Sequence, residues 1–278
     1  MTNATKKSQH LEILLSTIHQ SSLSFLEKMF SATEIKDFNV LVINQINEEQ
    51  VLKSENKHVR VINSLEIGLS KSRNLALKNA SGDICLFADD DVTYVDNFKE
   101  IIISAFDKHK DADIITFQMN SDDGKLFRDY PDIERHTKKT VYTSNSVVIA
   151  FRLEAIKNKI EFNTHFGLGA KFEVADEYIF LRDALKEGLL VYFEPKVILS
   201  HPKFSSGQEA ASDRVIYGRG ALYYKYYGFR SYFRIAKHIY RTFSDGKLSF
   251  SEIIPKFSTA LKGINDYKQL LKQGLETR

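Results

Sequence analysis

Three consecutive aspartates are the clearest candidates for chemistry in this sequence. Asp89, Asp90 and Asp91 come directly after an apolar run at residues 84–87. Adjacent carboxylates repel one another, and a hard cation such as Mg²⁺ or Mn²⁺ is the simplest reason to hold them together. The alternative is a solvated acidic turn that caps the next helix. The position after a buried strand favours the metal site, because ligands of open parallel sheets bind at the carboxyl ends of strands.

A second acidic pair, Asp176 and Glu177, opens a predicted helix over residues 175–186. A carboxylate in a partly dry cleft can have its pKa raised towards the range in which it accepts a proton from a hydroxyl group. Acids in the first turn of a helix also complement the helix dipole, so a purely structural role is the alternative.

Strands and helices alternate along the sequence up to about residue 205. Strands are expected over 12–18, 38–43, 59–62, 83–88, 113–119, 143–151, 189–193 and 197–200, and helices over 23–30, 70–78, 96–109 and 175–186. Continuous apolar strands that alternate with helices predict an α/β fold with a mostly parallel sheet covered on both faces.

Composition excludes several classes of protein. Hydrophobic residues make up 43% of the 278 residues and charged residues 27%, as in an ordinary folded protein. The single cysteine, Cys85, allows no internal disulfide and is expected as a buried core thiol. No apolar stretch suggests a signal peptide or a membrane span, so we expect a cytoplasmic protein and leave attachment to a membrane surface open.

Charge changes character in the last part of the chain, and we predict a domain over 1–205 and a helical basic extension over 206–278. Residues 214–244 contain no acid and seven arginines or lysines, interleaved with tyrosine and phenylalanine. Three interpretations remain: helices that complete a core, a surface for an anionic membrane, or a nucleic-acid surface. No nucleic-acid motif accompanies the charge, so nucleic acid is not an expected partner.

The residues from Gly68 to Asp91 form a recognisable series. A glycine is followed by Arg73-Asn74 opening a helix, then Gly82-Asp83, an apolar strand and the Asp-x-Asp element. This series resembles the nucleotide-binding half of inverting family-2 glycosyltransferases of the GT-A fold, including those that build bacterial capsular and cell-surface polysaccharides. The resemblance covers roughly residues 10–205 and implies an α/β GT-A fold.

The resemblance implies a role for each residue around the acidic run. Asp89 and Asp91 match the two acids of the Asp-x-Asp element: one contacts the ribose and the other, Asp91, the metal. Asp90 fills the variable position and could serve either task. Arg73 matches the basic residue near the nucleotide, with an ordinary helix-surface arginine as the alternative.

Downstream, the pair Asp176-Glu177 stands where the family has a Glu-Asp pair, here in inverted order. Glu177 is the expected general base and Asp176 the alternative. His201 follows the last strand, where a histidine in related transferases can join the metal or the diphosphate. With Asp89 and Asp91 it forms the expected metal-binding set, although an isolated histidine can also be a packed surface residue.

Nucleotide contacts are less clear at the ends of the first two strands. Many family members carry an acid after the second strand that reads uracil, and this chain has Asn44-Gln45 there. The uracil-contacting residue is therefore left undefined. Thr17, at the end of the first strand, is a nucleotide neighbour by position, whereas Asn74 is expected to fix a loop.

The resemblance implies a Mn²⁺- or Mg²⁺-dependent glycosyltransferase that moves a hexose from a nucleotide sugar to an acceptor. UDP-sugars are the common donors, and glycans or lipid-linked sugars in polysaccharide synthesis are the common acceptors. Two alternatives stay open: a degenerate transferase that acts as a partner subunit, and a sugar nucleotidyltransferase. The latter normally has a glycine-rich phosphate loop after the first strand, where residues 16–21 read STIHQS.

Overall fold

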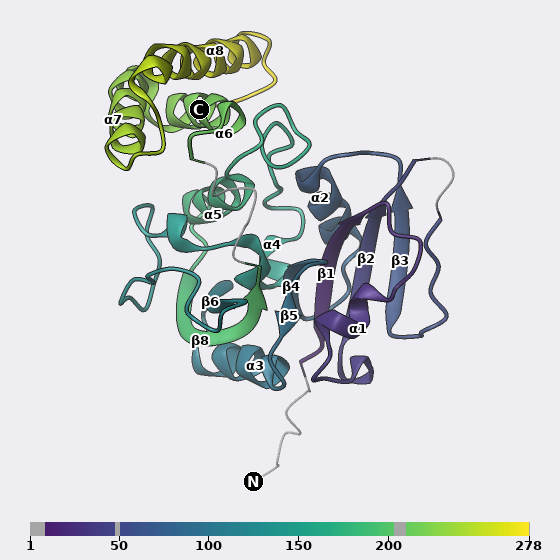
Figure 1. Cartoon of the computed structure of the whole chain (residues 1–278). Coiled ribbons are helices and arrows are strands. Elements are labelled where there is room, and N and C mark those ends of the chain that lie inside the picture. Colours follow the sequence, from purple (N-terminus) through teal and green to yellow (C-terminus); the bar gives the residue numbers. More distant parts are fainter. Residues whose placement is uncertain (1–8, 48–50, 203–209, 278) are drawn as a thin grey trace. The chain divides into compact units, whose positions relative to one another are not determined.

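The computed structural model describes residues 9–47, 51–202 and 210–277 (Figure 1). The chain forms two compact units. The first, called here the sheet unit, comprises Met1–Phe162 and Glu177–Lys203; the second, the helical unit, comprises Asn163–Asp176 and Phe204–Arg278. The segment of residues 163–176 thus groups with the C-terminal helices, although it lies within the sequence of the sheet unit.

One mixed sheet organises the sheet unit, with strands in the order β3-β2-β1-β4-β7-β6-β8-β5. Its strands are β1 Leu11–Ile18, β2 Asn39–Gln45, β3 Val59–Ser64, β4 Ile84–Asp89, β5 Thr93–Tyr94, β6 Ile114–Ser121, β7 Ile149–Arg152 and β8 Val191–His201. The pairs β1–β2, β2–β3, β1–β4 and β6–β8 are parallel, whereas β7 runs antiparallel to β4 and β6, and β5 antiparallel to β8. This confirms the predicted α/β class with a mostly parallel sheet.

Helices cover both faces of this sheet (Figure 1). On one face, α1 Phe25–Met29 and α3 Phe98–Lys108 pack on alternate residues of the central strands, such as Ile13 and Val42. On the other face, α2 Leu69–Asn79, the short α4 Leu153–Ile156 and α5 Asp176–Lys186 pack on the intervening residues, such as Leu14 and Phe87. Burial on both faces explains why β1, β2 and β4 read as continuous apolar runs.

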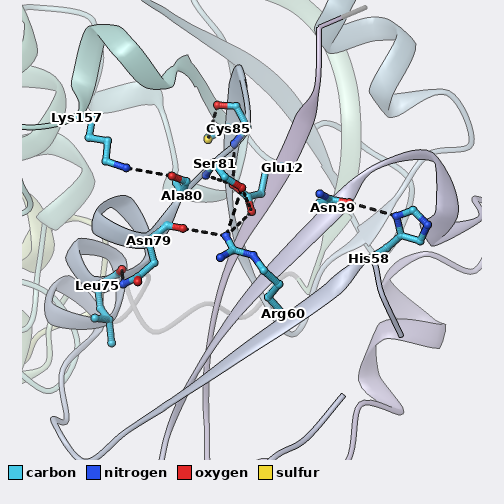
Figure 2. A network of polar contacts seen from close by, with 11 residues as sticks. Glu12, Asn39, His58, Arg60, Leu75, Asn79, Ala80, Ser81, Cys85 and Lys157 are labelled. Carbon is cyan, nitrogen blue, oxygen red and sulfur yellow. Dashed lines mark hydrogen bonds and ion pairs between the residues drawn. The ribbon is translucent and has the colours of Figure 1, made fainter. Parts of the chain in front are cut away.

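A buried carboxylate stabilises the amino-terminal edge of the sheet (Figure 2). Glu12 is fully buried and accepts hydrogen bonds from the backbone N–H groups of Ser81 and Gly82, at 2.6 and 2.9 Å. Arg60 donates from Nη2 to Glu12 Oε1 at 2.8 Å and to the Asn79 carbonyl at 2.8 Å. These bonds join β1, β3 and the turn before β4, on the edge opposite the carboxyl ends of the parallel strands. Cys85 is buried beside them, as predicted.

Two strand predictions were wrong in detail. The single strand expected over 143–151 is instead two 3₁₀ turns, Val141–Thr143 and Ser146–Val148, followed by the short β7. The two strands expected over 189–193 and 197–200 are one strand, β8, with a shift of register opposite β6. Pro195 lies exposed at this irregularity, where a proline removes no ladder hydrogen bond.

Three longer helices build the helical unit: α6 Asp213–Tyr227, α7 Ser231–Ser244 and α8 Ile253–Lys272. Glycines let α6 and α8 approach closely, since a Cβ on Gly220 would lie 2.2 Å from the Ala260 carbonyl oxygen and one on Gly263 would lie 2.0 Å from that of Tyr217. Ile216, Ile235 and Ile264 form the centre of its core. In the described part of the chain, no helix has the length and apolar character needed to cross a bilayer.

Candidate active site

The carboxyl edge of the parallel strands brings together the predicted site residues of the sheet unit. Asp89 is the last residue of β4 and lies opposite Ser16 of β1 in the parallel register. Asp90 and Asp91 follow in the turn that leads to β5. Open parallel sheets bind ligands outside the carboxyl ends of the strands at which the strand order reverses, and here the order reverses at β1, which lies between β2 and β4.

Asp90 is held by one residue of β1 and one residue just after it. The Thr17 hydroxyl donates to Asp90 Oδ2 in a short hydrogen bond, and Gln20 Nε2 donates to the same oxygen at 3.1 Å. Thr17 is 4% exposed, so its hydroxyl position is set by the packing of β1. Thr17 therefore lies next to the acidic run of residues 89–91, called here the acidic turn.

Arg73 lies beneath the acidic turn and is not a helix-surface residue, because its side chain is 1% exposed. Its Nη2 donates to Asp89 Oδ1 at 2.9 Å and to Ser146 Oγ at 2.7 Å, while the guanidinium stacks over the Phe162 ring. The arginine orients the carboxylate that ends β4. A fixed positive charge at this place also favours an anionic ligand above it.

Asp91 and His201 lie close together although they are 110 positions apart in the sequence. Asp91 Oδ1 lies 3.6 Å from His201 Nε2, and the Asp91 side chain is 50% exposed. The two-residue strand β5 explains this approach: Thr93 pairs with Ser200 near the end of β8, which returns the acidic turn to His201. This pairing of two strands that are distant in the sequence is what places His201 next to Asp91.

The remaining predicted residues lie at the start of α5. Glu177 is half-buried. Phe180, three residues later, contacts the Phe87 ring of β4 edge to face, with the ring centroids 5.6 Å apart. Only four residues separate the end of α5 from β8, and Leu190 donates to Asp113 just before β6. The C-terminus of α5 is thus at the amino-terminal edge of the sheet, and Glu177 lies towards the carboxyl edge that carries Asp89.

Asp176 is buried and is the last residue of the segment that groups with the helical unit. In that segment, Gly167 and Gly169 take positive φ values of 99° and 75°, which glycine adopts without strain. Phe172 packs on the rings of Tyr217 and Tyr267. The chain therefore enters α5 from a loop anchored on α6 and α8.

The comparisons with known proteins agree with this geometry. The family model described as glycosyl transferase family 2 matches residues 17–187, which is more than half of the chain and spans Thr17, the acidic turn and Glu177. This chain belongs to glycosyl transferase family 2. It is a glycosyltransferase with the GT-A fold.

Two solved structures resemble this family-2 enzyme in fold. TarS from S. aureus, residues 1–349 in complex with UDP-GlcNAc, superposes with a TM-score of 0.55 at 17% identity, over 95% of this chain and 92% of that chain. The mannosyltransferase PcManGT from Pyrobaculum calidifontis, in complex with GDP-Man and Mn²⁺, gives a TM-score of 0.54 at 13% identity, over 96% and 79%. No curated protein matches the sequence significantly.

The donor set of this glycosyltransferase fits a divalent metal shared with a substrate. Within the described residues, no three His, Cys, Asp or Glu side chains are grouped closely enough to hold an ion. Asp91 and His201 nevertheless supply one carboxylate and one imidazole side by side. Mg²⁺ and related ions often take only one or two protein ligands and complete their coordination with substrate phosphates and water. Asp89, the third predicted ligand, is ion-paired with Arg73 at 2.9 Å.

Sequence reasoning missed several residues that build the site. Gln20 contacts Asp90, Ser146 contacts Arg73, and Gln45 Oε1 accepts from the Gly68 N–H at 2.6 Å at the start of α2. None of these belongs to a local motif, because each acts through a partner far away in the sequence. Asn74 does fix a loop, as predicted, by two hydrogen bonds with the backbone of Phe162.

Proposed function

We propose that this family-2 glycosyltransferase transfers a hexose from a UDP-sugar to an acceptor hydroxyl with inversion at the anomeric carbon. The observation that carries the proposal is that the three adjacent aspartates have different partners. Asp89 faces Arg73, Asp90 faces Thr17 and Gln20, and Asp91 faces His201. A nucleotide sugar bound together with a metal ion presents sugar hydroxyls, a diphosphate and a cation. Three adjacent carboxylates in three different environments suit such a ligand.

The residues in and directly after β1 and β4 would bind the nucleotide. Asp89 and Asp90 would accept hydrogen bonds from the ribose hydroxyls, with Thr17 fixing the Asp90 carboxylate. Arg73 is buried and already bonded to Asp89, so it acts by orienting that carboxylate and by its positive charge. The fit of Thr17 and Arg73 to a nucleotide site is supported by their direct bonds to the acidic turn.

Asp91 and His201, with Asp89 nearby, would hold Mn²⁺ or Mg²⁺. When bound, such an ion neutralises negative charge on the diphosphate that leaves. The support from this chain is the half-exposed Asp91 carboxylate next to an imidazole. PcManGT, whose structure contains Mn²⁺ and GDP-Man, shares the fold.

Glu177 is the proposed general base, with Asp176 as the alternative. Its carboxylate would take the proton of the acceptor hydroxyl while the hydroxyl oxygen attacks the anomeric carbon and the nucleoside diphosphate departs. The support is positional, since α5 directs its N-terminus to the carboxyl edge of the sheet and packs on β4 through Phe180 and Phe87. One displacement inverts the anomeric carbon and needs no covalent enzyme intermediate.

The proposed acceptor is a glycan or a lipid-linked sugar in the assembly of a surface polysaccharide. A lipid-linked acceptor would place the enzyme in the cytoplasm, at the inner face of the cell membrane. The basic, aromatic-rich helical unit supports that location.

A donor panel tests the proposal. The protein is incubated with UDP-glucose, UDP-galactose, UDP-GlcNAc, GDP-mannose and dTDP-glucose, each with Mn²⁺, with Mg²⁺ and with EDTA, and released nucleoside diphosphate is measured. We expect release from one UDP-sugar that EDTA abolishes. Release from a GDP- or dTDP-sugar alone would refute the UDP preference, and no release or binding with any donor would favour the non-catalytic partner subunit.

A further inference from the structure

Helix α7 presents an aromatic strip to solvent. Phe233 and Tyr240 on its outer face are both 68% exposed, and Phe229, in the turn before the helix, is 75% exposed. The inner face of the same helix packs Ile235 and Ile239 into the core of the helical unit. The exposed rings therefore do not contribute to the core, and they are in contact with water unless a partner covers them.

The aromatic strip continues beyond the end of α7. Phe229 and Phe233 contact edge to face at 6.0 Å, and Phe243 contacts Phe250 at 6.4 Å in the turn before α8. Phe250 and Ile254, four residues apart, are 81% and 80% exposed. The aromatic strip comprises Phe229, Phe233, Tyr240, Phe243 and Phe250, and Ile254 adds an exposed aliphatic side chain four residues after Phe250. So many exposed apolar residues close together are unlike the single exposed apolar side chains of an ordinary surface.

A cationic strip runs beside the aromatic one. With about 100° of rotation per residue, Lys237, Arg241 and Arg234 fall on the flank of the outer face next to Phe233 and Tyr240. All three are exposed, and Arg234 stacks over the Tyr227 ring at 3.6 Å. Exposed Arg230 and Lys247 extend the positive charge towards the two ends of the helix.

Few acids interrupt this face. Residues 214–244 contain no aspartate or glutamate. Asp245 and Glu252 follow, both exposed, and Glu252 is engaged by the N–H and hydroxyl of Ser249, at 2.8 and 2.6 Å. The face therefore keeps a net positive charge.

We infer that the aromatic strip of α7, with its cationic flank, binds the surface of an anionic lipid bilayer. Aromatic rings settle at the boundary between headgroups and acyl chains, and adjacent lysines and arginines bind anionic headgroups. A nucleic-acid duplex would leave the apolar rings uncovered, and a second copy of the chain would bring two positive faces together. The bilayer satisfies both the apolar and the charged part of this face.

Co-sedimentation with vesicles of phosphatidylcholine alone, or mixed with phosphatidylglycerol, tests this inference without relying on the proposed catalytic function. The full chain should bind the anionic vesicles, and 0.5 M NaCl should weaken that binding. F233S/Y240S removes the apolar anchor and K237Q/R241Q the charge. Each should lower the partition coefficient about tenfold or more, as expected when two such groups leave a membrane interface.

Matched controls separate the strip from exposed aromatic or charged residues in general. Tyr142, which is 67% exposed on the sheet unit, gives the control Y142S, and the exposed lysines of α8 give K262Q/K272Q. Both controls should bind vesicles as the unchanged chain does, and all variants should keep its circular dichroism. Equal loss in controls and strip variants would overturn the inference. So would binding to duplex DNA without binding to vesicles, or a dimer in sedimentation velocity that F233S/Y240S dissociates while vesicle binding is absent.

Discussion

Arg73 Nη2 lies 2.9 Å from Asp89 Oδ1, and the arginine is 1% exposed while the carboxylate is 28% exposed. The carboxylate that ends β4 is thus held by a buried positive charge. Burying that guanidinium costs desolvation free energy, which the bonds to Asp89 and Ser146 offset.

Replacing Arg73 by methionine tests this coupling between stability and site. R73M leaves Asp89 without its cation, and we expect a loss of about 2–3 kcal/mol in the free energy of unfolding, below the full value for buried pairs because Asp89 is partly solvated. Urea denaturation measures it, with K71M on the exposed face of α2 as the control. A loss no larger than that of K71M would contradict the role given to Arg73.

Glu12 predicts a pH dependence of stability. Burial opposes ionisation of its carboxyl group, but the bonds from Ser81, Arg60 and Gly82 outweigh burial and lower its pKa below 4.5. A lowered pKa in the folded state stabilises the protein above the unfolded pKa, and this contribution is lost as the pH falls through the folded value. E12Q should therefore be less stable than the unchanged chain at pH 7, by about 1–3 kcal/mol.

The difference between the two proteins should shrink below pH 4.5, and urea denaturation between pH 3 and pH 7 records it. E27Q, at an exposed position of α1, is the control and should show no such trend. A difference that stays constant over this range would mean that ionisation of Glu12 does not contribute.

The close approach of α6 and α8 at Gly263 predicts that a larger residue there lowers stability. A Cβ at this position would lie 2.0 Å from the backbone oxygen of Tyr217, and backbone cannot rotate away as a side chain can. G263A should lower the free energy of unfolding by about 1–3 kcal/mol despite its better helix propensity. S258A, at an exposed position of the same helix, should be neutral or slightly stabilising, and thermal unfolding compares the two. Equal stability of both variants would disprove the close approach.

The role proposed for Glu177 predicts that its replacement slows turnover without weakening the binding of UDP. If it removes the acceptor proton, E177Q should lower kcat by about a hundredfold or more while the Kd of UDP stays within about twofold. E187Q, near the C-terminus of the same helical region, is the matched control and should retain full turnover. Full activity of E177Q together with inactivity of D176N would transfer the role to Asp176.

The core of the fold could be predicted because β1, β2 and β4 are apolar on both faces and thus form unbroken runs. The turn around Ser146 could not, since Ser144 and Ser146 interrupt an apolar stretch for a reason that appears only when Ser146 meets Arg73. Likewise, β5 has two residues and no pattern of its own. The pairing of β5 with β8 is what creates the contact of Asp91 with His201.

The acidic turn was visible in the sequence because its residues are consecutive. Gln20 and Ser146 were not, because nothing local distinguishes a glutamine or serine that will contact a charged side chain from one that faces water. Resemblance supplied the roles of Arg73 and Glu177, whereas the structure showed that Arg73 is buried and that Phe180 attaches α5 to β4.

Calorimetric titration with UDP tests the central claim most directly, using the unchanged chain, D91N and the control D96N, each with Mn²⁺ and with EDTA. Asp96 is exposed in the turn before α3 and has no place in the proposed site. We predict UDP binding that depends on Mn²⁺ in the unchanged chain and in D96N, and at least tenfold weaker binding in D91N, equal to that of the unchanged chain with EDTA. UDP binding that neither EDTA nor D91N changes would contradict a metal-assisted nucleotide site at Asp91.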